Sequence, residues 1–150
     1  MIRIGIDPSF RKSGFAAAMI EDKTIKIKMF ENYNDFVLWL FSEESPDKAK
    51  VVVENSNLQN STFDTRGNKF EVARKSRNVG ANQAVSQLTV WICELKFGKE
   101  NVLGISPKKK GKKWTKEQFQ FIIQTENLIF DSRLNNQDIR DAVKLALFNF

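Results

Sequence analysis

Three short runs of strand-forming residues at the start of the chain constrain its fold most strongly. Isoleucines alternate with other residues from Ile2 to Ile6, an apolar run follows over 15–20, and apolar and polar residues alternate again over 24–30. Alternation with a period of two is the pattern of a β-strand. Because the connection Asp22-Lys23 is too short for a crossover, these runs are expected to pair antiparallel. The first part of the chain therefore predicts a three-strand antiparallel meander.

Helical and strand-like patterns alternate in the remainder of the chain. They predict a helix capped by Asn34, a strand over 50–54, a helix over 80–97 ended by Gly98, and a strand over 102–105. Two further helices are predicted, one capped by Thr115 and the last capped by Asn136 or a neighbouring residue. We therefore expect one domain over residues 1–150, an α/β fold with a mixed five-stranded sheet. Three strands form the meander, two further strands are parallel, and helices cover both faces. This order is the layout of the ribonuclease H fold.

Residue composition restricts the chemistry that the chain can perform. It has no histidine and a single cysteine, Cys93, which we expect in the core. These counts exclude an internal disulfide, Ser-His and Cys-His nucleophilic mechanisms, and the usual zinc hydrolase ligand sets. Hydrolysis would have to rest on carboxylates, lysines and hard metal ions. The net charge of +6 favours polyanionic partners. With no apolar run long enough for a membrane span and no signal peptide, we expect a cytoplasmic protein without a membrane partner.

Four acidic residues lie at the ends of predicted elements. Asp7 and Glu54 each end a strand, and Asp138 and Asp141 lie three residues apart at the start of the last helix. The two strands are neighbours in the expected layout, and residues at i and i+3 share one helix face. Each acid alone has an ordinary explanation as a turn or surface residue. Together they predict a cleft of carboxylates that needs cations, for which magnesium is the fitting ion.

Two segments are polar and basic. Residues 55–78 are predicted as a long loop, with basic side chains at Arg66, Lys69, Arg74, Lys75 and Arg77 and aromatic ones at Phe63 and Phe70. A second basic loop over 107–113 carries Lys108, Lys109, Lys110, Lys112 and Lys113. We expect the basic residues to contact DNA phosphates, one of these lysines to stabilise transition-state charge, and the phenylalanines to stack on unpaired bases. Solvated surface loops and core packing are the alternatives.

Three motifs resemble those of the RuvC Holliday-junction resolvases. They are IGIDPSFRKSGFA at the start, VVVEN at the second acid, and QDIRDAVKLAL at the end. The resemblance implies a homodimeric endonuclease that uses two magnesium ions, with manganese as a possible substitute, and makes paired nicks in four-way DNA junctions. It also implies that Asp7, Glu54, Asp138 and Asp141 are the metal ligands. The helix over 80–97 would form the dimer interface, and the short chain would fit a phage or prophage member.

The chain departs from the family pattern at two places. Ser9 stands where glycine is usual, and Asn57 and Leu58 stand where an aromatic is expected behind the second acid. Phe63 and Phe70 could take over base stacking. Three alternatives remain: a catalytically silent branched-DNA-binding module of the same fold, another ribonuclease H-fold nuclease, and a phosphotransferase of the actin and sugar-kinase type. The last needs two such domains and further glycine-bearing phosphate loops, which this chain lacks.

Overall fold

A computed structural model describes residues 1–9, 14–58, 66–131 and 133–150. The strands are β1 (Arg3–Asp7), β2 (Phe15–Glu21), β3 (Thr24–Phe30), β4 (Lys50–Glu54) and β5 (Val102–Ile105). They form one sheet in the order β3-β2-β1-β4-β5. The pairs β1–β2 and β2–β3 are antiparallel. The pairs β1–β4 and β4–β5 are parallel. The mixed five-stranded sheet, with its antiparallel meander and two parallel strands, is as predicted.

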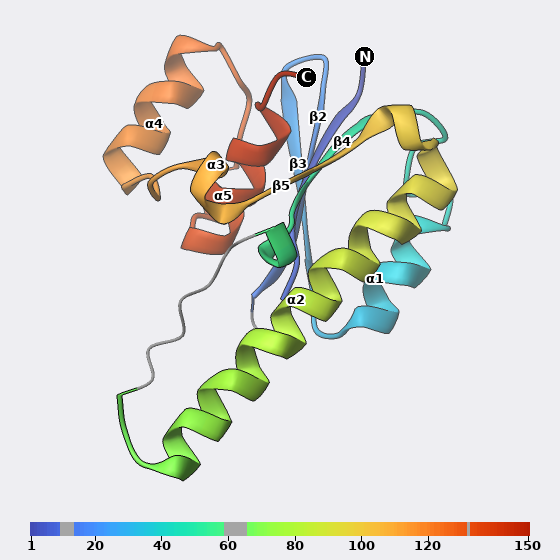
Figure 1. Cartoon of the computed structure of the whole chain (residues 1–150). Helices are drawn as coiled ribbons and strands as arrows, with labels where there is room; N and C mark the ends of the chain where they lie inside the picture. Colours follow the sequence, from blue (N-terminus) through green and yellow to red (C-terminus); the bar gives the residue numbers. More distant parts are fainter. Residues whose placement is uncertain (10–13, 59–65, 132) are drawn as a thin grey trace.

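Helices cover both faces of this sheet (Figure 1). They are α1 (Tyr33–Leu40), α2 (Lys69–Phe97), α3 (Pro107–Lys110), α4 (Lys116–Thr125) and α5 (Gln137–Ala146), with short 3-10 turns η1 (Ser56–Leu58) and η2 (Lys99–Asn101). One core contains Ile4, Ile6 and Val53 of the sheet with Phe36 of α1 and Cys93 of α2. The opposite core packs Ala16 and Ala18 of β2 against α4 and α5. The α/β sandwich therefore agrees with the predicted architecture.

α5 crosses β1 with no room for a side chain between them. A Cβ atom added to Gly5 would lie 2.0 Å from the carbonyl oxygen of Ala142 and 2.2 Å from the amide nitrogen of Ala146. Both are backbone atoms, which cannot rotate away as a flexible side chain can. Only glycine at this position allows α5 to lie directly on the first strand, and α5 carries two of the predicted acids.

The start of α2 differs from the prediction. The structure has no long loop up to residue 78, because the helix begins at Lys69 with Asn68 as its cap, whose side chain accepts a hydrogen bond from the amide of Glu71. The first half of α2 projects away from the sheet (Figure 1). Since little of this half is covered, its residues can be polar and still be helical. The first helix is also capped earlier than expected, by Asn32 rather than Asn34.

The two faces of α2 differ in the size of their apolar residues. Leu88, Trp91 and Leu95 are 45%, 60% and 78% exposed. The buried face instead contains Ser86, Thr89, Val90, Cys93 and Phe97. Thr89 satisfies its hydroxyl by donating to the carbonyl of Val85 at 2.7 Å. Small residues on this face let the helix approach the sheet closely, and the larger apolar residues are left outside.

Cys93 lies fully buried in the core, as expected, and burial raises the pKa of its thiol to about 12. Of the tryptophans, Trp39 is buried and Trp114 packs against the core beneath α5. None of the helices in the described ranges combines the length and apolar character that crossing a membrane requires.

Candidate active site

Two of the predicted acids end neighbouring parallel strands. The register pairs Ile6 with Val53, and Asp7 and Glu54 each follow one position later. Ile6 and Val53 pack into the core beneath α1 and α2. Because successive side chains in a strand point to opposite faces, the two acids leave the sheet on the side covered by α5.

The other two acids come from the first turns of α5. The helix is capped by Asn136, whose side chain accepts a hydrogen bond of 2.9 Å from the amide of Ile139. Asn136 is therefore the cap, as predicted. Because Asp138 and Asp141 lie three residues apart, they share one helix face, and Asp141 is almost fully buried at 3% exposure.

All four acids line one pocket, between the carboxyl ends of β1 and β4 and the first turns of α5. Its other lining residues are Pro8, Ser9, Gly14, Ser56, Asn82, Ser86, Pro107, Lys110 and Lys113. The structure thus brings Asp7, Glu54, Asp138 and Asp141 together, although they are far apart in the sequence.

The ammonium group of Lys110 lies within this pocket. It forms ion pairs with Glu54 and, at 3.0 Å, with Oδ2 of Asp141, and its side chain is only 7% exposed. Residues 107–113 were predicted as one basic loop, and this prediction is wrong for 107–110, which are helical. α3 begins at Pro107, with Ser106 as its cap, and its last residue is Lys110. This short helix turns the lysine inward, so in this conformation it neutralises acids and is withdrawn from the surface.

Burial and neighbouring charges shift several pKa values in the pocket. Loss of solvent, followed by repulsion from Glu54, holds the pKa of Asp7 well above its usual value. Burial and the neighbouring Asp141 raise the pKa of Asp138. Burial alone would lower the pKa of Lys110, but the surrounding carboxylates outweigh it and the pKa is raised. The pocket therefore stabilises positive charge and disfavours uncompensated negative charge.

The donor chemistry of the pocket fits a hard divalent cation. Carboxylate oxygens from three elements surround it, and magnesium prefers such ligands. The ammonium group of Lys110 is a stand-in cation that already occupies part of this position. In the part of the chain that the structure describes, no group of three or more acidic or cysteine side chains is arranged to hold a metal ion. Side chains would therefore have to move, and Lys110 would have to withdraw, before a divalent ion could bind.

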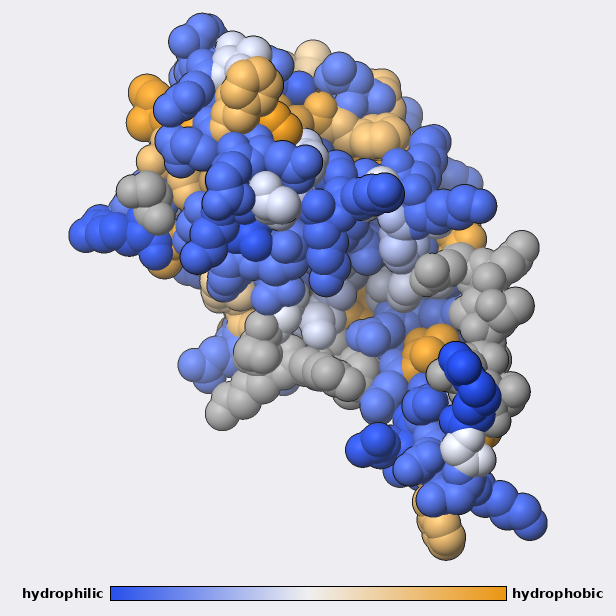
Figure 2. Space-filling view, turned by 90° about the vertical axis from the view of Figure 1, so that its left-hand side faces the viewer, coloured by the Kyte–Doolittle hydropathy of each residue, from blue (hydrophilic) through white to orange (hydrophobic). Residues whose placement is uncertain are grey.

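Most of the predicted DNA-contacting residues lie on the surface around the pocket and along α2. Lys108, Lys109, Lys112 and Lys113 are exposed, as are Arg66, Lys69, Arg74 and Arg77, while Lys75 is half-buried. Phe70 is 87% exposed near the start of α2. Phe63 lies outside the described residues. Figure 2 shows this side of the molecule as largely hydrophilic, with the first half of α2 projecting below the body.

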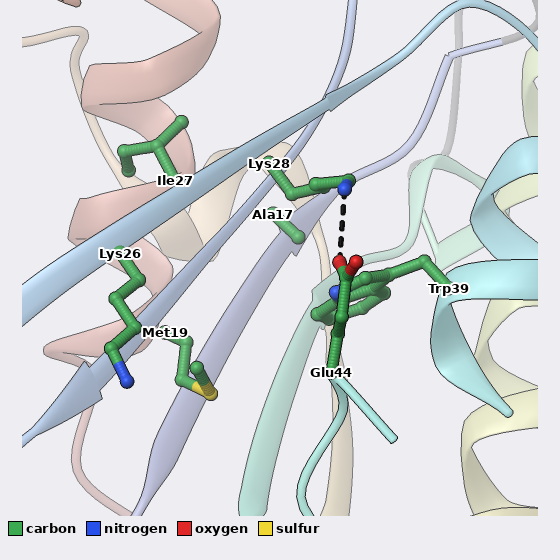
Figure 3. Close-up of a pocket in the computed structure, with 7 residues that line it drawn as sticks. All are labelled: Ala17, Met19, Lys26, Ile27, Lys28, Trp39 and Glu44. Carbon is green, nitrogen blue, oxygen red and sulfur yellow. Dashed lines mark hydrogen bonds and ion pairs between the residues drawn. The ribbon is translucent and has the colours of Figure 1, made fainter. Parts of the chain in front are cut away.

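A second hollow lies over the middle of β2 and β3, beside α1 (Figure 3). Met19, Ile27 and Trp39 form its apolar lining, and Lys28 and Glu44 close one side through an ion pair of 3.0 Å. Both partners of this pair are well exposed, so it contributes little stability. The hollow contains a single acid, Glu44, and is separate from the acidic pocket.

Two residues beside the acids were not singled out by the sequence patterns. The side-chain amide of Gln137 donates to Oδ1 of Asp141 at 2.7 Å, and the buried Arg140 donates to Oε1 of Gln137 at 2.9 Å. The spacing could have indicated Gln137, because it precedes Asp141 by four residues and side chains at this spacing are neighbours on a helix.

Comparisons with known proteins find similarity at the level of structure. Neither a protein-family model nor a curated protein sequence matches the chain. The structure is similar to a solved chain described as T. thermophilus RuvC in complex with Holliday junction substrate. The identity is 16%, the match covers 98% of this chain and 90% of that chain, and the TM-score is 0.48.

Proposed function

We propose that the chain is a magnesium-dependent endonuclease that cleaves branched DNA, with four-way junctions as the first candidate substrate. The observation that carries this proposal is the convergence of Asp7, Glu54, Asp138 and Asp141 on one pocket around the ammonium of Lys110. A structural role would not require four acids from three elements at one point, because their mutual repulsion costs stability. The motifs resembling the resolvase family direct the choice of substrate.

The four acids would hold the magnesium ions, and manganese, which also binds oxygen ligands, could replace magnesium. When bound, such ions activate a water molecule and stabilise the leaving oxygen of a phosphodiester. The chain's own residues bind the ions, exclude part of the solvent and balance charge. No side chain has to act as a covalent nucleophile, which agrees with the absence of histidine from the sequence.

Basic residues on two sides of the pocket would hold the DNA backbone. Lys113 lines the pocket itself and interacts electrostatically with Asp138, so a phosphate near the acids would also be near this lysine. Arg74 and Arg77 are exposed on the projecting half of α2, with Phe70 one turn before them. Phosphate contacts of this kind release counterions, so we expect affinity to fall steeply with salt. Phe70 could stack on an unpaired base.

A homodimer through α2 would supply two sites for paired nicks. The exposed apolar positions Ala84, Leu88, Trp91 and Leu95 follow the alternating spacing of four and three residues that forms the seam of a coiled coil. A seam of this kind is self-complementary across a twofold axis. We therefore propose a second copy of the chain as the partner of this face.

A catalytically silent branched-DNA-binding module is the second candidate. It is favoured by the position of Lys110, whose charge satisfies Glu54 and Asp141 without a metal ion. Such a module would retain the basic surface and bind junctions equally well with magnesium or with EDTA. Cleavage is therefore the property that separates the two candidates.

The test is a comparison of labelled four-way junction, flap, linear duplex and RNA–DNA hybrid substrates, each with magnesium, manganese or EDTA. We expect nicking of the junction with either metal and none with EDTA. Tight junction binding without nicking under any condition would favour the silent module. Preferential cleavage of the hybrid would indicate another ribonuclease H-fold nuclease.

A further inference from the structure

Arg140 is a buried cation beside the acidic pocket, yet it binds neutral oxygens. It lies on α5 between Asp138 and Asp141 and is 8% exposed. Its guanidinium donates to the carbonyl of Trp114 at 3.1 Å and to the side-chain oxygens of Asn135 and Gln137, each at 2.9 Å. Burial of an arginine is costly unless its donors are satisfied, so this arrangement fixes the guanidinium firmly.

The fixed guanidinium determines which way the amide of Gln137 faces. Arginine has only donors, so it must contact the oxygen Oε1 of Gln137. The amide nitrogen Nε2 then points the other way and donates to Oδ1 of Asp141 at 2.7 Å. A reversed amide would place a donor against Arg140 and an acceptor against the carboxylate, so both contacts would be lost.

The carboxylate of Asp141 is consequently held at both oxygens by different groups. Oδ1 accepts from Gln137 within the same helix, whereas Oδ2 accepts from Lys110 of α3 at 3.0 Å. The two contacts differ in kind. Gln137 is neutral and anchored by Arg140, and Lys110 is a flexible cation that a divalent ion could replace.

The same helix holds the basic segment that follows α3. Arg140 binds the carbonyl of Trp114, and one turn later the ammonium of Lys144 donates to the carbonyl of Lys112 at 2.5 Å and lies 4.9 Å from the ring centre of Trp114. Side chains on one face of α5 therefore hold both the carboxylate of Asp141 and the backbone of residues 112–114 in place.

We propose that Gln137 and Arg140 are positioning residues that turn Oδ2 of Asp141 toward the cation position of the pocket. This inference rests on the proposed function, in which Asp141 holds a metal ion. Arg140 acts through Gln137, and Gln137 acts through Asp141, so neither residue has to touch the substrate. Groups that orient a metal ligand in this way typically change metal affinity or activity about 10–100-fold when they are replaced.

Gln137→Met tests the inference, because methionine has a similar length and cannot make either hydrogen bond. The matched control is Gln124→Met, at an exposed position of α4. Three properties are measured for each variant and the wild type: magnesium affinity by calorimetry with the metal alone, junction affinity in EDTA, and nicking rate at saturating magnesium. The thermal midpoint in EDTA reports whether the fold is retained.

We expect Gln137→Met to weaken magnesium binding about 10–100-fold and to slow nicking, with junction affinity unchanged. The thermal midpoint in EDTA should fall, because a donor of the buried Arg140 loses its acceptor. A residue that only supported the fold would lower the thermal midpoint and leave the magnesium affinity of the folded protein unchanged. Arg140→Lys, which keeps the charge and loses the planar fork, should change metal affinity in the same direction. Wild-type magnesium affinity and nicking rate in Gln137→Met would overturn the inference. Absence of magnesium binding by the wild type would overturn the proposed function itself.

Discussion

The ammonium nitrogen of Lys110 lies 3.0 Å from Oδ2 of Asp141, inside the pocket that Asp7, Glu54 and Asp138 also line. The chain thus provides one tethered positive charge for a group of acids that would otherwise repel one another. A divalent ion bound by these acids would have to compete with this lysine for the same oxygen. Stability without metal and affinity for metal are therefore linked through one side chain.

Replacing Lys110 by methionine should make the protein less stable without metal. Removal of one partner from a buried ion pair costs about 3–5 kcal/mol, and partial protonation of the acids would keep the loss near 3 kcal/mol. Urea unfolding in EDTA measures this loss, and Lys108→Met, at an exposed position of the same helix, is the control. The variant should also gain more stability from magnesium than the wild type. Equal stability of the two variants would contradict the role of Lys110 as a counter-charge.

Asp7→Asn should stabilise the metal-free protein increasingly as pH rises. The folded-state pKa of Asp7 lies above its unfolded value of 3.8, so between the two values the folded state binds more protons than the unfolded state. The contribution of Asp7 to wild-type stability therefore falls as pH rises from about 3.8 through the folded pKa and is level above it. Urea unfolding of both proteins in EDTA from pH 4 to pH 8 checks this sign. A stability difference that shrinks with rising pH would show that ionised Asp7 is not destabilising.

Gly5→Ala should push α5 away from the first strand. The added Cβ would overlap backbone atoms of Ala142 and Ala146, and overpacking of this kind costs about 3 kcal/mol. Because α5 carries Asp138 and Asp141, magnesium affinity should fall as well. Gly80→Ala is the matched control, since a Cβ there meets no atom within 4 Å and should stabilise the helix by about 0.5–1 kcal/mol. Similar stability changes in both variants would exclude the close approach as the reason for glycine.

Trp91→Glu should convert a dimer into a monomer. The charge would lie in the middle of the exposed apolar seam of α2, where burial of an unpaired carboxylate is unfavourable. Analytical ultracentrifugation at micromolar concentration measures the change. Phe121→Glu, which replaces a 68% exposed aromatic on α4, should leave the dimer intact. A monomeric wild type, or a dimeric Trp91→Glu variant, would remove α2 as the interface.

Sequence periodicity was sufficient for the sheet and for the positions of the acids. The bounds of β3 and β4 are as predicted, because their alternating or β-branched residues are bordered by polar ones. Asn136 caps the last helix as expected, and its side chain makes the capping bond. Local patterns of this kind determine where elements begin, and the known layout then brings their ends together.

Sequence periodicity did not predict the start of α2 or the buried position of Lys110, because no apolar periodicity marks either of them. The first half of α2 has no apolar stripe to mark it, although Asn68 and Glu71 carry a capping signal that could have been recognised. The sequence does not distinguish the apolar residues of this helix that meet the sheet from those that do not, and the largest of them, including Trp91, are exposed. The inward turn of Lys110 depends on contacts with Glu54 and Asp141, which are distant in sequence. No property of the lysine-rich run distinguishes this lysine from its neighbours.

The most direct test is a calorimetric titration of magnesium into the wild type and into the Asp138→Asn/Asp141→Asn double variant, without DNA. The two α5 acids lie in the same pocket as Asp7 and Glu54. We expect the wild type to bind magnesium and the double variant, still folded by its thermal midpoint, to lose most of this binding. A wild type that takes up no magnesium, or a double variant that binds it equally well, would contradict the proposal that these four acids form a metal centre.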